Sequence, residues 1–260
     1  MVPSVSEIEE LVIKRHDFLD ALDDSPATKP ELVDRLNTSR STVDRAIDDL
    51  ERCNFVSRPD DRYQLTMAGK AVHEQHQSYL DDLQPIQQAL EVLAMLPPDV
   101  PFSFDLLEDA RVRRAESHDP HQPLELAAET MSRAAQVKTL SPAVFPRCVE
   151  AIKEWANDGK TVELAVPEDV LDTMADRYRD ELSSLEGPGH SLYELPTAPP
   201  YTLWIAETAD EKYTGLMPNA ATGVQGLIVT DNDDARQWAS EQYESYLEQA
   251  TPVERLEGRA

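Results

Sequence analysis

The chain has 260 residues and is 40% hydrophobic, which is enough for one large domain or two smaller ones and argues against wholesale disorder. Its 50 acidic residues against 24 basic ones give a formal net charge of −26. Such a charge repels DNA at long range, and it keeps a protein hydrated in concentrated salt. We therefore expect a halophilic protein, with an acidic protein of an ordinary cytosol as the alternative.

The sequence also indicates where the protein works. Its two cysteines imply no disulfide framework, and the start MVPSVSEIEE has neither the basic nor the apolar region of a signal peptide. No uncharged apolar stretch reaches the length of a membrane span. We expect a soluble, cytoplasmic protein that does not bind membranes.

Residues 1–66 are predicted to form a winged helix-turn-helix. Apolar residues at helical spacing between Ile8 and Leu22 predict a first helix, which ends in the turn-rich segment DDSPATKP. A short second helix has Leu32 on its inner face, and Ser39 is a candidate N-cap for a third helix. The runs FVSR and RYQL, separated by PDD, predict a hairpin that forms the wing.

The N-terminal part of the third helix, in the segment NTSRSTVDRAIDDLERC, is the predicted DNA-reading element. A helix-turn-helix places this part in the major groove, where arginine matches guanine and hydroxyl groups bond bases or phosphates. Residues 35–70 hold seven basic and six acidic residues, whereas the rest of the chain holds 17 and 44 and carries −27. The predicted DNA contacts are Ser39, Arg40, Ser41, Thr42 and Arg45 on the helix, with Arg58, Arg62 and Tyr63 at the hairpin.

Residues 67–96 are predicted to form a long linker helix, which Pro85 kinks or divides. The segment PPDVP marks a domain boundary near residue 97. The apolar stripe of this helix is longer than a small winged helix needs, so we expect a homodimer; packing against the chain's own α/β domain is the alternative. The stripe comprises Leu80, Leu83, Ile86, Leu90, Leu93 and Leu96.

Residues 97–260 alternate short β-rich runs with helical runs and then give four strand-like runs in succession. This order predicts an α/β domain with a mixed sheet, so the whole chain falls in the α+β or α/β class. The segment PTAPPYTLWIAE offers Tyr201, Trp204 and Glu207 as a site for a sugar-like or polar effector. Because Tyr201 and Trp204 point to opposite faces of a regular strand, the alternative is that Trp204 is a core residue.

Catalytic motifs are missing from the sequence. There is no GxGxxG, P-loop or GxSxG pattern, and no histidine is followed two residues later by lysine. The stretch HEQHQ is one residue short of the HExxH zinc spacing, and the loop HDPH offers only two histidines. We predict no enzyme activity, no cofactor and no metal.

Two parts of the chain resemble known regulators. Residues 28–66, with TSRSTVDRAIDDLERCNFVSR at their centre, resemble archaeal winged helix-turn-helix transcription regulators. The runs PPYTLWIAE and GLIVTDNDDARQWASEQYESYLEQA resemble the C-terminal domain of the methanogenesis-regulator (FilR-type) family of haloarchaea. The resemblance implies a sequence-specific regulator that binds double-stranded promoter DNA, and it gives Arg40, Ser41, Thr42 and Arg45 the base-reading role.

The resemblance also implies that the C-terminal domain senses an effector or mediates assembly. The first rival is an interaction adaptor whose winged helix docks on a protein partner. The second is a ligand-processing enzyme with an appended DNA anchor.

Overall fold

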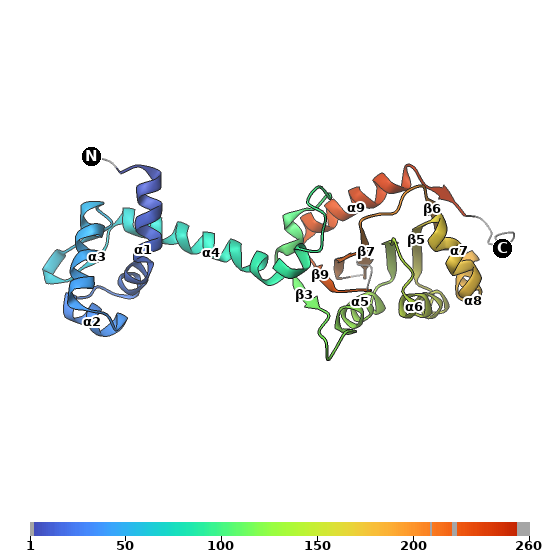
Figure 1. Cartoon of the computed structure of the whole chain (residues 1–260), viewed down its shortest axis with the longest axis horizontal. Helices are drawn as coiled ribbons and strands as arrows, with labels where there is room; N and C mark the ends of the chain where they lie inside the picture. The colour runs from blue at the N-terminus through green and yellow to red at the C-terminus, as the bar shows by residue number, and fades with distance from the viewer. Residues whose placement is uncertain (1–2, 209, 220–222, 254–260) are drawn as a thin grey trace. The chain divides into compact units, whose positions relative to one another are not determined.

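The chain folds into two compact units, Met1–Gln84 and Pro85–Ala260. The computed structural model describes residues 3–208, 210–219 and 223–253, apart from the side chains of residues 147, 152, 156, 157 and 186. Figure 1 shows the course of the chain through both units. The boundary lies inside the segment 67–96 that the sequence predicts as a linker, and a single helix, α4 (Met67–Leu93), runs through Pro85.

The N-terminal unit has the element order helix, helix, helix, hairpin, helix. Side chains at the starts of the first three helices accept hydrogen bonds from backbone N–H groups: Ser4 before α1, Thr28 before α2 and Ser39 before α3. Asn37 ends the second helix in a left-handed conformation. The elements are α1 (Val5–Asp24), α2 (Lys29–Leu36), α3 (Arg40–Arg52), β1 (Val56–Ser57), β2 (Gln64–Leu65) and α4.

The core of this unit forms where the three helices meet the hairpin. Its centre is fully buried, as the helical spacing of the apolar residues predicts: Leu19, Leu32, Val43, Ala46, Ile47 and Leu50. The hairpin packs so closely on α4 that a Cβ at Gly69 would lie 2.0 Å from the carbonyl oxygen of Phe55. Only glycine fits the first turn of α4 without moving the hairpin.

The C-terminal unit is built on one mixed sheet of eight strands in the order β10-β6-β5-β4-β7-β8-β9-β3. The three strands β4, β5 and β6 are parallel, and all other neighbours are antiparallel. This mixed sheet confirms the fold class predicted for residues 97–260. The strands are β3 (Arg111–Arg114), β4 (Gln136–Leu140), β5 (Thr161–Pro167), β6 (Ser191–Leu195), β7 (Tyr201–Glu207), β8 (Lys212–Pro218), β9 (Gly226–Thr230) and β10 (Thr251–Pro252).

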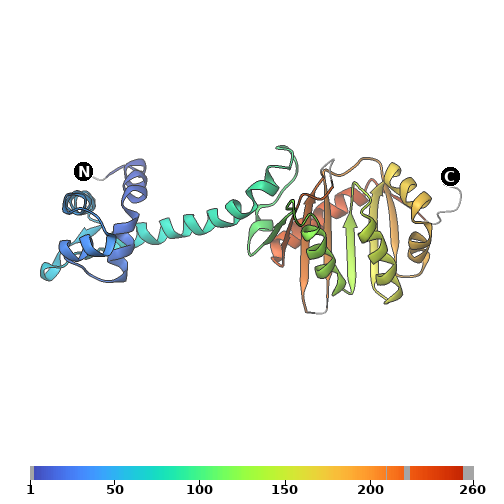
Figure 2. The same cartoon turned by 60° about the horizontal axis from the view of Figure 1, so that its bottom comes forward.

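Helices cover both faces of this sheet and make a three-layer unit (Figure 2). One face packs against α5 to α8, and the other face packs against α9 and the short helix η2. The covering elements are η2 (Phe104–Leu107), α5 (Gln122–Ser132), α6 (Pro146–Asn157), α7 (Glu168–Arg177), α8 (Arg179–Ser183), η3 (Ser184–Glu186) and α9 (Asp233–Leu247). Within the described residues, no helix has both the length and the apolar character that crossing a membrane requires.

Strand β7 lies at the centre of the sheet and is buried on both faces. Trp204 and Ala206 point into the core under α5–α8, whereas Tyr201, Leu203 and Ile205 point into the core under α9. The indole of Trp204 lies over its cross-strand partner Gly215, where a Cβ would come within 2.1 Å of the ring. The glycine therefore makes room for the largest fully buried side chain among the described residues.

Candidate functional site

The first turn of α3 forms a small polar cluster that Ser39 organises. The Ser39 hydroxyl accepts a hydrogen bond from the backbone N–H of Thr42 and lies 2.9 Å from the Ser41 hydroxyl and 2.8 Å from the Thr42 hydroxyl. These contacts start the helix directly after the turn at Asn37. Three of the predicted DNA contacts are thus brought together at one helix end, where N–H groups favour anions.

Two arginines on α3 have unoccupied guanidinium groups. Arg40 and Arg45 are exposed, and in the described part of the chain neither side chain makes a hydrogen bond or an ion pair. An arginine in this state has five N–H donors available to an outside partner. Both stand beside the Ser39 cluster in sequence, so five predicted contacts fall on the first two turns of one helix.

The other basic side chains around α3 and the hairpin are bound within the unit. Arg52 pairs with Asp49 at 2.7 Å, Arg58 with Asp61 at 2.9 Å and Arg62 with Glu31 at 2.9 Å, while Lys29 pairs with Asp44 at 2.7 Å. Arg62 also donates to the carbonyl oxygen of Pro26 at 2.7 Å. These pairs neutralise the charge of each group and occupy part of its hydrogen-bonding capacity.

The hairpin residues predicted to contact DNA make contacts within the unit. Tyr63 is 6% exposed and belongs to the core, where the cations of Lys29 and Arg58 lie over its ring. Arg62 ties the hairpin to the segment before α2. The hairpin tip carries Asp60 and Asp61, both with positive φ. These acids place negative charge at the tip, beside the paired Arg58 and Arg62.

Lys29 is a residue that pattern analysis missed. Its hydrogen bond to Asp44 raises the pKa of Lys29 above its ordinary value, and this pair neutralises an acid on the outer side of α3. Lys29 precedes Asp44 by 15 residues, so only the packing of α2 on α3 reveals the pair. The pair reduces the negative charge beside Arg40 and Arg45.

The predicted effector residues do not form one site. Tyr201 lies under α9, where its hydroxyl donates to the carbonyl oxygen of Pro101 at 3.1 Å and burial raises its pKa. Trp204 lies in the core on the opposite face, and Glu207 is the half-buried end of the strand. Strand alternation separates the two aromatic rings, so a pocket shared by Tyr201, Trp204 and Glu207 is ruled out.

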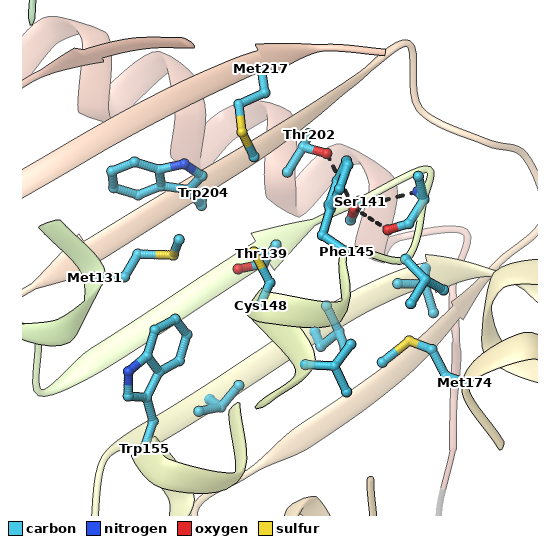
Figure 3. A pocket seen from close by; sticks show the side chains of 16 residues that line it. Met131, Thr139, Ser141, Phe145, Cys148, Trp155, Met174, Thr202, Trp204 and Met217 are labelled. Atoms are coloured by element: carbon cyan, nitrogen blue, oxygen red, sulfur yellow. Dashed lines mark hydrogen bonds between the residues drawn. The ribbon is translucent and has the colours of Figure 1, made fainter. Parts of the chain in front are cut away.

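Trp204 instead lines a cavity of about 50 Å³ beneath α6 (Figure 3). Most of its wall is apolar. One side carries two hydroxyl groups, Ser141 at the end of β4 and Thr202 on β7, whose oxygens are 3.1 Å apart. Cys148 also contacts the cavity, and burial raises the pKa of its thiol to about 11. Sequence patterns do not single out these residues because they come from separate strands and helices.

Among the residues that the structure describes, no group of three or more His, Cys, Asp or Glu side chains is arranged to hold a metal ion. His73, in the HEQHQ stretch, is buried with its ring nitrogens 3.4 and 3.7 Å from Asp20 and Asp23. His118, in the HDPH loop, lies 3.1 Å from Glu116 on the surface.

Solved structures show distant similarity. TrmBL2, described as an archaeal chromatin protein with a novel mode of DNA binding, is 13% identical with a TM-score of 0.44, over 96% of this chain and 100% of its own. Nuc, a phospholipase D family member from Salmonella typhimurium, is 12% identical with a TM-score of 0.41, over 56% of this chain and 98% of its own. Polyphosphate kinase from Porphyromonas gingivalis is 9% identical with a TM-score of 0.41, over 74% of this chain and 28% of its own. These similarities are too weak to bear on function.

Family comparisons are more informative. No curated protein sequence matches the chain. Residues 7–88 match the HVO_A0261 N-terminal domain. Residues 120–249, half of the chain, match the middle domain of methanogenesis regulatory protein FilR1. The chain therefore belongs to the family of the FilR1 middle domain.

Proposed function

We propose that this protein is a sequence-specific, DNA-binding transcription regulator whose N-terminal unit is a winged helix-turn-helix. One observation carries the proposal: Arg40 and Arg45, at the start of α3, have no partner among the described residues, while the arginines at the end of α3 and on the hairpin are paired. Arginine in the major groove bonds the O6 and N7 acceptors of guanine. Membership in the family of a regulatory protein supports the same role.

The net charge of the chain fits a DNA-binding protein that works in concentrated salt. With a net charge of −26, long-range attraction to DNA contributes nothing to binding. In molar salt the release of counterions from DNA also drives binding weakly, so affinity depends on direct base contacts and shape. We therefore propose a halophilic archaeal regulator, with binding to be measured in molar KCl.

Substitution of the two free arginines tests the proposal. Arg40→Ala and Arg45→Ala should each weaken binding to the protein's own promoter by roughly 1–3 kcal/mol, because each removes a bidentate base contact. Fluorescence anisotropy with the promoter duplex and a scrambled duplex of equal length measures the change. Binding to the scrambled duplex should change little.

Arg52→Ala is the matched control, since it removes the same charge from the last turn of the same helix. It should leave the preference for the promoter unchanged. If Arg40→Ala and Arg45→Ala behave like Arg52→Ala, α3 is not the reading helix. Promoter binding no tighter than scrambled binding in the wild type would favour the adaptor, a role that the acidic hairpin tip also allows.

We further propose that the regulator is a homodimer that joins through its N-terminal units. Tyr79 is 55% exposed and Leu83 38% exposed on α4. Beside them a groove of about 410 Å³ separates α1 from α4, lined by Ile8, Ile13 and Val72 among others. A second copy that covers this apolar surface would also supply the second recognition helix that a two-fold DNA site needs.

Charge introduced into this surface tests the dimer. Leu83→Glu should convert the dimer into a monomer, because the partner would bury an unpaired carboxylate. Light scattering at micromolar concentration in molar KCl measures the mass. Ser78→Glu, at an exposed polar position of the same helix, should leave the dimer intact. A monomeric wild type would contradict this part of the proposal.

For the C-terminal unit we propose a binding role and no catalysis. The sequence has no histidine followed two residues later by lysine, which is the pair that some phosphodiesterases use. It also has no GxSxG nucleophile motif. Of the three residues first assigned to an effector, Trp204 lines the cavity beneath α6. Any effector control of DNA binding would start at that cavity.

A further inference from the structure

Strand β3 concentrates positive charge at one end of the sheet. Residues 85–260 hold 14 basic and 32 acidic residues and carry −18, yet three of the basic residues fall in the four-residue run RVRR. This run is strand β3, which ends the eight-stranded sheet beside β9 (Figure 1). Its arginines, Arg111, Arg113 and Arg114, are all exposed. A basic strand at the edge of so acidic a unit indicates a surface for an acidic partner.

Two of these arginines have no carboxylate partner in the described part of the chain. Arg111 holds its cation over the ring of Tyr213, 5.5 Å from the centroid, and makes a long contact of 3.4 Å with the Thr130 hydroxyl. Arg113 donates at 2.9 Å to the carbonyl oxygen of Val112. Arg111 and Arg113 lie two positions apart, so they share one face of the strand. Most of their N–H donors can therefore bind carboxylates that are also two residues apart.

The outer edge of β3 also offers backbone groups. Successive residues of an antiparallel strand turn their N–H and C=O groups alternately toward and away from the neighbouring strand. Ala115 donates a backbone hydrogen bond to Gln225, which continues the register of β3 on β9. The second and fourth residues before it therefore bond to β9 as well. The N–H groups of Val112 and Arg114 point to the free edge, where no strand of the described residues pairs with them.

A groove of about 600 Å³ runs beside this edge, between β3 and the second half of α4. The side of α4 contributes the exposed amides of Gln87 and Gln88 and the carboxylate of Glu91, which pairs with Arg114. A second copy of β3 does not suit this edge. Every antiparallel register that joins the free edges of two copies of RVRR sets an arginine opposite an arginine, which is destabilising. The partner strand must bring acidic groups instead.

We propose that the edge of β3 binds an extended acidic segment of a partner protein as an added strand, with carboxylates at alternate positions opposite Arg111 and Arg113. The residues between the carboxylates exchange backbone hydrogen bonds with Val112 and Arg114. A nucleic-acid backbone would use the arginines but not the outward backbone groups, so a peptide accounts for both observations. The site is separate from α3, and failure to bind promoter DNA would leave this inference standing.

Synthetic peptides test both parts of the inference. The parent peptide alternates threonine and glutamate over seven residues, and a control has glutamine in place of glutamate. Binding to the full chain is measured by fluorescence anisotropy in molar KCl. The parent should bind about fivefold more tightly than the glutamine peptide, because two exposed ion pairs are lost. A parent peptide that does not bind, or that binds no better than the glutamine peptide, would overturn the proposal.

Two N-methylated forms of the parent peptide test the backbone hydrogen bonds. With glutamates opposite Arg111 and Arg113, the N–H groups of the threonines point toward β3 and those of the glutamates point away. Methylation of the threonine nitrogens should therefore weaken binding more than about tenfold, whereas methylation of the glutamate nitrogens should change it less than about twofold. Equal effects of the two methylation patterns would show that the peptide does not add a strand.

Amide hydrogen exchange in the full chain locates the bound peptide. The parent peptide should slow exchange at Val112 and Arg114 and leave Arg111 and Arg113 unchanged, because the latter two already bond to β9. A DNA duplex of random sequence should protect none of these amides. If the duplex protects Val112 and Arg114 and the peptide does not, the edge binds nucleic acid and the inference is wrong.

A double variant isolates the arginines. Arg111→Gln with Arg113→Gln should remove the fivefold preference for the parent peptide and leave binding of the glutamine peptide unchanged. The matched control is Arg133→Gln with Arg179→Gln, which removes two exposed arginines from α5 and α8. It should keep the preference. If both double variants lose the preference alike, the net charge of the unit and not β3 selects the acidic peptide.

Discussion

Trp204→Ala should lower the free energy of unfolding of the C-terminal unit by roughly 3–5 kcal/mol, because it removes the largest fully buried side chain and leaves a cavity. A cavity already lies on one side of the Trp204 ring, beneath α6. Few neighbouring side chains can therefore move in to fill the space that the ring leaves. Trp155 and Trp238 stay in the same unit and report its unfolding by fluorescence in urea. A loss below about 1 kcal/mol would mean that Trp204 is not packed as described.

The effect of Gly215→Ala on stability should depend strongly on whether Trp204 is present. In the wild type, Gly215→Ala places a methyl group 2.1 Å from the indole and should cost about 1–3 kcal/mol. In the Trp204→Ala background the methyl group has room, and alanine should be neutral or stabilising by about 0.5 kcal/mol, since glycine weakens a strand. The double-mutant cycle should give a coupling of about 1–3 kcal/mol. Additive effects would show that the two residues do not touch.

Gly69→Ala should destabilise the N-terminal unit by about 1–3 kcal/mol. The new Cβ would lie 2.0 Å from the carbonyl oxygen and 2.9 Å from the carbonyl carbon of Phe55, and a backbone group cannot rotate away. Phe55 is itself 4% exposed, and its carbonyl accepts from the N–H of Thr66, so the hairpin must shift as a whole. Hydrogen exchange of α1–α3 amides measures the loss, while tryptophan fluorescence, confined to the other unit, should be unchanged.

Ala71→Gly on the same helix is the matched control. This alanine is exposed, so the change reports helix propensity alone and should cost about 1 kcal/mol. Without the contact at Phe55, Gly69→Ala would gain the same amount. A stabilised Gly69→Ala variant would therefore show that the hairpin does not pack on the first turn of α4.

Much of the fold could be predicted because local signals and burial agree. Val43, Ala46, Ile47 and Leu50 recur at helical spacing and are all fully buried. Each predicted strand of the C-terminal unit overlaps an observed one, since runs such as YTLWIAE are mainly apolar and lie at the centre of the sheet. The two-residue strand β10 was not predicted, because it is too short to show a period.

The candidate sites were harder to predict because their residues depend on distant partners. The exposed side of α3 follows from its period, which placed Arg40 and Arg45 off the core. Nothing local reveals that Arg62 binds Pro26, 36 residues earlier, or that Tyr63 is buried. The cavity at Trp204 likewise needs the strand order of the sheet, which brings Ser141 beside Thr202 across 61 residues.

The contact between Trp204 and Gly215 limits which substitutions these two positions can accept during evolution. A side chain at position 215 is tolerated only where position 204 already holds a smaller residue. Each single change is therefore destabilising, through lost packing at position 204 or through a clash at position 215. A smaller residue at position 204 together with a side chain at position 215 would remove the clash at the centre of the sheet, so the two positions are expected to change as a pair.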